Sequence, residues 1–260
     1  MMRGSARIVY ARCGTLGSRP MQDSLAISVF IILVGPFVGS FIGVLVDRMK
    51  RGADVVVAPS TCQTCGLRLR IFDLVPILSF LGAQGRCRHC GVTLPRWLLG
   101  LELLAGALGI AAVVAGDGLV GALVLWLLLA LGAVDAAVFR LPNLLVAALL
   151  LAVLLRAPDL SQALIGAALG SGIFALIRWG YGSVRGREGM GLGDVKLMAP
   201  LGAFVGPLLL PQLVLVAAAL AFAGALVLRR SGEALSAATP LPFGTALCAS
   251  AFLLWVVLGL

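Results

Sequence analysis

The sequence predicts an all-α polytopic membrane protein with about eight transmembrane helices and a small zinc-binding loop domain between the first and second helices. Of the 260 residues, 61% are hydrophobic and only 12% are charged, whereas soluble domains carry about twice that charged fraction. The mean hydropathy is +1.10. These values exclude a soluble enzyme, a disordered chain and a fibrous repeat, and they make the lipid bilayer an expected partner.

The distribution of apolar residues divides the chain into four predicted regions. A tail covers residues 1–23, and a first transmembrane helix covers 24–46, which is long enough to cross a hydrocarbon core of about 30 Å. A charged, cysteine-bearing loop domain covers 47–96, and 97–260 is predicted to form a seven-helix transmembrane domain. The seven apolar runs of that domain cover residues 97–115, 118–138, 143–155, 161–181, 192–206, 208–228 and 242–260.

The positions of the basic residues predict the orientation in the membrane. If the 47–96 loop is cytoplasmic, fifteen of the twenty Lys and Arg residues fall on the cytoplasmic side, as the positive-inside rule requires. The tail, with four arginines, is the exception, and it is explained either by a real extension or by a true initiator at Met21. The basic residues form short clusters rather than a long stripe with aromatics, so nucleic acid is not an expected partner.

Four of the six cysteines form two Cys-x-x-Cys pairs, 21 residues apart, in the predicted cytoplasmic loop. Two such pairs complete a tetrahedral Zn²⁺ site, and four thiolates leave no open position for a catalytic water. We therefore expect structural zinc, held by Cys62, Cys65, Cys87 and Cys90. The alternative is a pair of disulfides in a membrane thiol redox protein, which would require the loop to face the oxidising side.

Three acidic residues fall within predicted spans, where an ionisable group is costly unless it is paired or faces water. They are Glu102, Asp135 and Asp194. Asp135 and Asp194 are 59 positions apart, yet both are predicted to lie at cytoplasmic helix ends. Two carboxylates that share a site and a proton can activate water, as in aspartic proteolysis. Two unrelated helix-end carboxylates, or a proton-coupled transporter, are the alternatives.

The residues around Asp194 favour proteolysis. Gly191 and Gly193 permit an irregular backbone on which a substrate strand could approach, and Lys196 is placed to support the site or to reach the membrane interface. The only histidine, His89, lies in the cysteine loop. The sequence therefore offers no HExxH metalloprotease motif and no Ser–His pair within the membrane.

A series of motifs over about residues 39–244 resembles the type IV prepilin peptidases, which are GxGD-type aspartyl proteases of bacterial inner membranes. The matching segments, in order, are Gly39-Ser40-Phe41, the two cysteine pairs enclosing Asp73, Pro76 and Ser79-Phe80, then Glu102, Asp135 with Leu141-Pro142-Asn143, Gly191-Leu192-Gly193-Asp194, and Leu241-Pro242-Phe243-Gly244.

The resemblance implies an activity and a set of roles. Asp135 and Asp194 would be the catalytic pair that removes a short basic leader from prepilin or pseudopilin precursors on the cytoplasmic side, just after a glycine. Such enzymes serve type IV pili and type II secretion, and many members also methylate the new N-terminus with S-adenosylmethionine. Glu102 would then lie near the methyl donor, or it would pair with Arg96. Gly43 and Leu74 depart from the family pattern, which has Asn at both positions, and this puts methylation in doubt.

Overall fold

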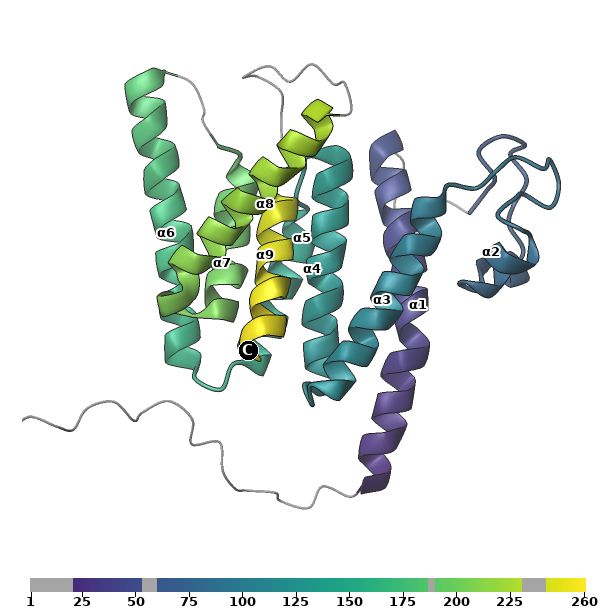
Figure 1. The fold of residues 1–260 in the computed structure, drawn as a ribbon, viewed down its shortest axis with the longest axis horizontal. Coiled ribbons are helices and arrows are strands. Elements are labelled where there is room, and N and C mark those ends of the chain that lie inside the picture. The colour runs from purple at the N-terminus through teal and green to yellow at the C-terminus, as the bar shows by residue number, and fades with distance from the viewer. Residues whose placement is uncertain (1–20, 53–59, 187–189, 231–241) are drawn as a thin grey trace, which may run out of the picture.

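The computed structural model describes residues 21–52, 60–186, 190–230 and 242–260, so residues 1–20 of the predicted tail lie outside the described residues. Within these ranges the chain folds into eight long helices and contains no β-strand, which confirms the predicted all-α class (Figure 1). The long helices are α1 (Met21–Arg51), α3 (Arg96–Val114), α4 (Gly118–Val138), α5 (Asn143–Arg156), α6 (Leu160–Arg185), α7 (Leu192–Val205), α8 (Leu210–Arg230) and α9 (Phe243–Leu258). The short elements are α2 (Leu78–Gly82) and the 3₁₀ turns η1 (Ile71–Leu74) and η2 (Pro207–Leu209).

Five helices are long and apolar enough to cross a membrane. They are α1 from Leu25 onward, α3, α4, α6, and α8 together with η2. Helices α5 and α9 are apolar but shorter, and α7 has only 14 residues. These three shorter helices contribute many of the buried side chains, so they form part of the interior of the bundle.

The first helix is longer at both ends than the sequence predicted. It includes Met21 and continues to Arg51, whereas the expected boundaries were 24 and 46. Three basic residues lie in its last turn, where positive charge stabilises the carbonyl end of the helix dipole. The predicted loop domain consequently starts inside α1, and its independent part begins after residue 51.

Helices α1 and α3 pack closely on one flank of the bundle (Figure 1). A Cβ atom added at Gly39 would lie 2.4 Å from the carbonyl oxygen of Leu101 and 2.6 Å from the Cα of Glu102. Only glycine permits this approach, because small residues let transmembrane backbones come into contact. The contact fixes the depth of Glu102 relative to α1.

Helix α4 is the most buried of the five candidate membrane spans, and its sides contact α1, α3, α5 and α9. Its Trp126 donates an indole hydrogen bond of 2.8 Å to the carbonyl oxygen of Ala105 in α3, so that the polar atom of a buried aromatic side chain is satisfied. Asp135 lies three residues before α4 ends at Val138. The central helix therefore carries a predicted catalytic residue near its C-terminal end.

The opposite end of the bundle holds an ion pair that the sequence did not predict. The side chain of Asp117 is only 19% exposed, and Arg156 binds it at 2.8 Å. The indole of Trp255 also donates to Asp117, at 2.9 Å, and Arg156 donates to the carbonyl oxygen of Leu260. These bonds form a clamp that joins the start of α4 to the ends of α5 and α9. Each charge of the ion pair needs the other as a partner, because the surrounding helix ends are apolar.

Candidate active site and metal centre

The described residues 60–95, between α1 and α3, form a loop module. The four predicted cysteines converge in this module. Their sulfur atoms all lie within 4.8 Å of one another, and the Sγ atoms of Cys62 and Cys90 are 3.8 Å apart. Tetrahedral zinc with Zn–S bonds of about 2.3 Å requires sulfur–sulfur separations of about 3.8 Å. The donor set therefore fits zinc. His89, which lies between Cys87 and Cys90, does not belong to this cluster.

The two halves of the metal centre have the same backbone geometry. In the first, the Cys62 amide donates to Leu67 and the Gly66 amide donates to Cys62, both at 2.9 Å. In the second, the amides of Cys87 and Gly91 make the corresponding bonds at 2.8 and 2.9 Å. Gly66 and Gly91 adopt φ of 70° and 71°, a conformation that glycine adopts without strain. The paired turns are those that the cysteine spacing predicted.

The electrostatics of the four thiols favour a bound cation. The backbone amides of Cys65 and Thr64 stabilise the Cys62 thiolate and lower its pKa to about 6. At Cys90, the Val92 amide favours the thiolate, but desolvation and the neighbouring cysteines outweigh it and raise the pKa to about 11. A thiolate at Cys62 therefore disfavours a second thiolate at Cys90, and a divalent cation would remove that repulsion.

Asp135 is buried and oriented by α9. Its Oδ2 accepts hydrogen bonds from the backbone amide of Thr245 at 2.7 Å and from the Thr245 hydroxyl at 3.1 Å. The same hydroxyl donates to the carbonyl oxygen of Gly132 at 2.9 Å. Gly244 lies directly against the carboxylate, since a Cβ atom there would be 2.9 Å from Oδ2. The carboxylate is therefore fixed by hydrogen bonds and by close packing.

Asp194 lies in the first turn of α7 and interacts electrostatically with Asp135. The thiol of Cys248 in α9 interacts electrostatically with both carboxylates. Gly191 caps α7, and Gly193 packs against Leu141, whose Cδ1 would be 3.2 Å from an added Cβ. The structure thus brings together the two acids that the sequence paired across 59 positions.

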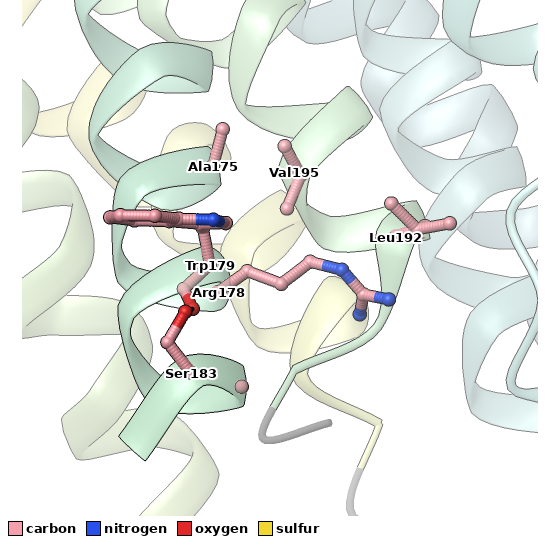
Figure 2. Close-up of a pocket in the computed structure, with 7 residues that line it drawn as sticks. Ala175, Arg178, Trp179, Ser183, Leu192 and Val195 are labelled. Carbon is pink, nitrogen blue, oxygen red and sulfur yellow. Dashed lines mark hydrogen bonds between the residues drawn. The ribbon is translucent and has the colours of Figure 1, made fainter. Parts of the chain in front are cut away.

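Two basic residues hold the segments around Asp194. Lys196 donates to the side-chain oxygen of Asn143 at 3.0 Å, which joins α7 to the start of α5. Arg178 of α6 donates to the carbonyl oxygen of Met190, just before Gly191. Figure 2 shows Arg178 reaching toward Leu192 across a pocket of about 480 Å³ between α6 and α7.

Comparison with known proteins decides the family. Residues 122–227 match the Type IV leader peptidase family, and residues 33–115 match the bacterial Peptidase A24 N-terminal domain. A protein of Burkholderia pseudomallei named prepilin leader peptidase/N-methyltransferase is 37% identical over 254 residues, which cover 85% of this chain and 82% of that protein. The chain belongs to the type IV leader peptidase family.

Other relatives carry the same name. The protein of Dickeya chrysanthemi is 33% identical, with 85% of this chain and 89% of the relative covered. That of Pseudomonas aeruginosa is 32% identical, with 89% and 91% covered. No solved structure matches the chain.

Glu102, the third intramembrane acid, contacts the loop module rather than a charged partner. Its Oε2 accepts the backbone amide of Ile77 at 2.7 Å, and the residue is 8% exposed. Of the two roles expected for Glu102, the structure does not show the pairing with Arg96, and the carboxylate instead binds the backbone that precedes α2. Ile77 has φ of 61°, which is unusual for a β-branched residue, and the bond to Glu102 helps to hold that conformation.

The departure from the family pattern at Gly43 also has a structural explanation. A Cβ atom at Gly43 would lie 2.7 Å from Cδ2 of Leu98, so an apolar side chain of α3 fills the space beside it. A methyl donor near Glu102 would thus meet an apolar wall and a carboxylate already bonded to backbone. Gly43 and Glu102 thus both contact protein atoms, Gly43 the side chain of Leu98 and Glu102 the amide of Ile77.

Sequence reasoning did not identify Thr245 or Arg178, and it named Asn143 in a motif without giving it a role. Thr245 orients Asp135, Arg178 holds the backbone before Gly191, and Asn143 binds Lys196. Thr245 follows Gly244 directly, so the motif ending in Pro-Phe-Gly was the available signal. Arg178 had no such signal, because a single arginine near a helix end is also what the positive-inside rule predicts.

Proposed function

We propose that this chain is an intramembrane aspartyl endopeptidase of the bacterial inner membrane that removes the basic leader of type IV prepilin-like precursors at the cytoplasmic face. The observation that carries the proposal is the convergence of Asp135 and Asp194, from separate helices, at the end of the bundle next to the loop module. Family membership supplies the substrate class, since the relatives are named for prepilin.

The geometry suggests how the two acids would divide the work. Thr245 binds Oδ2 of Asp135 twice, so we assign Oδ1 to the attacking water. One carboxylate accepts the proton of that water, and the partner, which holds the shared proton, donates it to the oxygen of the scissile carbonyl. When the tetrahedral intermediate collapses, the carboxyl group that accepted the water's proton donates it to the departing amine of the mature chain, and the other carboxylate takes back the hydroxyl proton as the carbonyl group re-forms. Gly191 and Gly193 would let the substrate backbone approach Asp194.

The metal centre has a structural role in this proposal. Four cysteine ligands would fill every position of a tetrahedral zinc ion, and Asp73 braces the module by pairing with Arg88 at 3.2 Å. Methylation of the new N-terminus belongs to the proposal through the relatives' name alone. Its methyl donor would be S-adenosylmethionine, bound on the side of the loop module in the region of Glu102.

Substitution of each aspartate tests the peptidase. Asp135→Asn and Asp194→Asn should each slow leader cleavage by at least about 100-fold, because a carboxamide neither accepts the water's proton nor shares one. A gel-shift assay of precursor and mature pilin in membranes reports the rate. Asp159→Asn is the matched control, since Asp159 caps α6 at the opposite end of the bundle. Wild-type cleavage by either catalytic variant would refute the assignment.

A further inference from the structure

The loop module exposes large apolar side chains outside the membrane-spanning helices. Phe72 is 75% exposed, Leu78 69% and Leu81 60%. Leu78 and Leu81 are three residues apart in α2, so they share one face of that helix. A module surrounded by water would not leave this much apolar surface uncovered, and exposed apolar patches mark sites of interaction.

The same module carries exposed arginines. Four arginines of the module are exposed, namely Arg68, Arg70, Arg86 and Arg88. The one acidic residue among residues 60–95, Asp73, is paired with Arg88. Apolar side chains flanked by arginines are typical of segments that lie in the membrane interface, where acyl chains take the apolar groups and anionic headgroups attract the cations.

The depth of the module relative to the bilayer is fixed by α3. Trp97 stacks under the ammonium group of Lys50 at the cytoplasmic ends of α3 and α1, and exposed tryptophans of this kind mark the headgroup level. Glu102 lies five residues, or about 7.5 Å, further into the membrane along α3. Because Glu102 binds the amide of Ile77 at 2.7 Å, the residue that precedes α2 is held at or below the headgroups. Figure 1 shows α2 beside α3, below the cytoplasmic end of α1.

We propose that η1 and α2 lie in the cytoplasmic leaflet of the bilayer, with Phe72, Leu78 and Leu81 among the acyl chains and the neighbouring arginines at anionic phospholipid headgroups. Glu102 is then a positioning residue that ties this interfacial segment to α3. The metal centre consequently rests on the membrane surface instead of projecting into the cytoplasm. The proposal does not depend on the peptidase activity.

Photo-crosslinking in the full chain tests this placement. A benzophenone amino acid replaces Phe72 or Leu78, and Thr64, an exposed polar residue at the tip of the first cysteine turn, is the matched control. The protein is reconstituted in phosphatidylglycerol nanodiscs without precursor, irradiated and analysed by mass spectrometry. We expect lipid adducts several-fold more often at positions 72 and 78 than at position 64. Equal labelling at the three positions would overturn the proposal.

Two further measurements distinguish membrane contact from a misfolded module and from a protein-docking surface. Retention of zinc by each variant shows that the module is folded, and only zinc-loaded protein is scored. When a precursor peptide is added, lipid adducts at position 78 should persist. If that position instead crosslinks to the peptide and gives no lipid adduct, the apolar face is a protein-docking surface and the membrane placement is wrong.

Discussion

Gly244→Ala is the substitution that most directly tests how Asp135 is positioned. Gly244 has ordinary helical geometry, so alanine is compatible with the backbone of α9. Its Cβ atom, however, would lie 2.9 Å from Oδ2 of Asp135 and 3.0 Å from Cγ, whereas ordinary contacts begin at 3.4 Å. The carboxylate therefore has to retreat by about 0.5 Å, away from its two hydrogen bonds to Thr245.

The expected loss of activity follows from those hydrogen bonds. Stretching the 2.7 Å and 3.1 Å contacts with Thr245 removes the equivalent of one charge-assisted bond, which is worth about 1.5–3 kcal/mol. If that energy orients Asp135 in the transition state, leader cleavage slows by about 10- to 150-fold, because about 1.4 kcal/mol corresponds to a factor of ten. No charged group is removed, so insertion into the membrane should not change.

Single-turnover cleavage of a precursor in proteoliposomes measures this effect. Gly132→Ala is the matched control, because Gly132 faces α9 from α4 and its added Cβ would meet Cys248 at an ordinary 3.5 Å. The control should cleave at close to the wild-type rate. If Gly244→Ala also cleaves within about threefold of wild type, which is well under 1 kcal/mol, the packed geometry around Asp135 does not contribute to catalysis.

Three other predictions concern the rest of the molecule. Purified wild-type protein should carry about one zinc ion per chain, and Cys62→Ser should lower both the zinc content and the protease resistance of the module, as measured by metal analysis and limited proteolysis; undiminished zinc would exclude the site. Glu102→Gln should leave cleavage and the protease resistance of the loop module nearly unchanged, since the side-chain amide oxygen still accepts the Ile77 amide. Glu102→Ala should make the module sensitive to protease. A large effect of Glu102→Gln on methylation alone, measured by mass spectrometry of mature pilin, would instead place Glu102 at the methyl-donor site. Asp117→Asn should lower stability to denaturation in mixed micelles by about 1.5–3 kcal/mol, because it weakens a largely buried charged hydrogen bond to Arg156, without slowing cleavage at the other end of the bundle; an unchanged transition would show that the clamp adds nothing.

Composition and local spacing were enough to predict the class of the fold and the four-cysteine cluster. A bilayer forces backbone groups to bond within each span, so apolar runs of sufficient length become helices whatever their neighbours are. The Cys-x-x-Cys turns close locally around their own backbone, as the matching bonds of Cys62 and Cys87 show. Asp135 and Asp194 were identifiable because ionisable residues are rare in such helices.

Helix ends were less predictable because hydropathy does not define them. Helix α1 continues through charged residues to Arg51, since arginine and lysine can extend from a helix end to the interface. Similarly, the sequence around Asp117 does not indicate its partner, because Arg156 is 39 positions away in the chain and only the fold brings the two side chains together.

Tertiary structure alone decided which polar groups meet. Thr245 reaches Asp135 across 110 residues, and the Ile77 amide reaches Glu102 across 25. No periodicity encodes such pairs, because they depend on how closely two helices approach. Glycine contacts set that distance, for example Gly39 of α1 against α3 and Gly244 of α9 against α4. The sequence by itself therefore determined that these acids lie in membrane helices and that four cysteines can hold one ion. Only packing decided that Thr245 holds Asp135 against α9 and that Glu102 joins the loop module to the bundle. The physical reason is that in an apolar medium each buried polar group bonds to whatever donor the fold brings within reach.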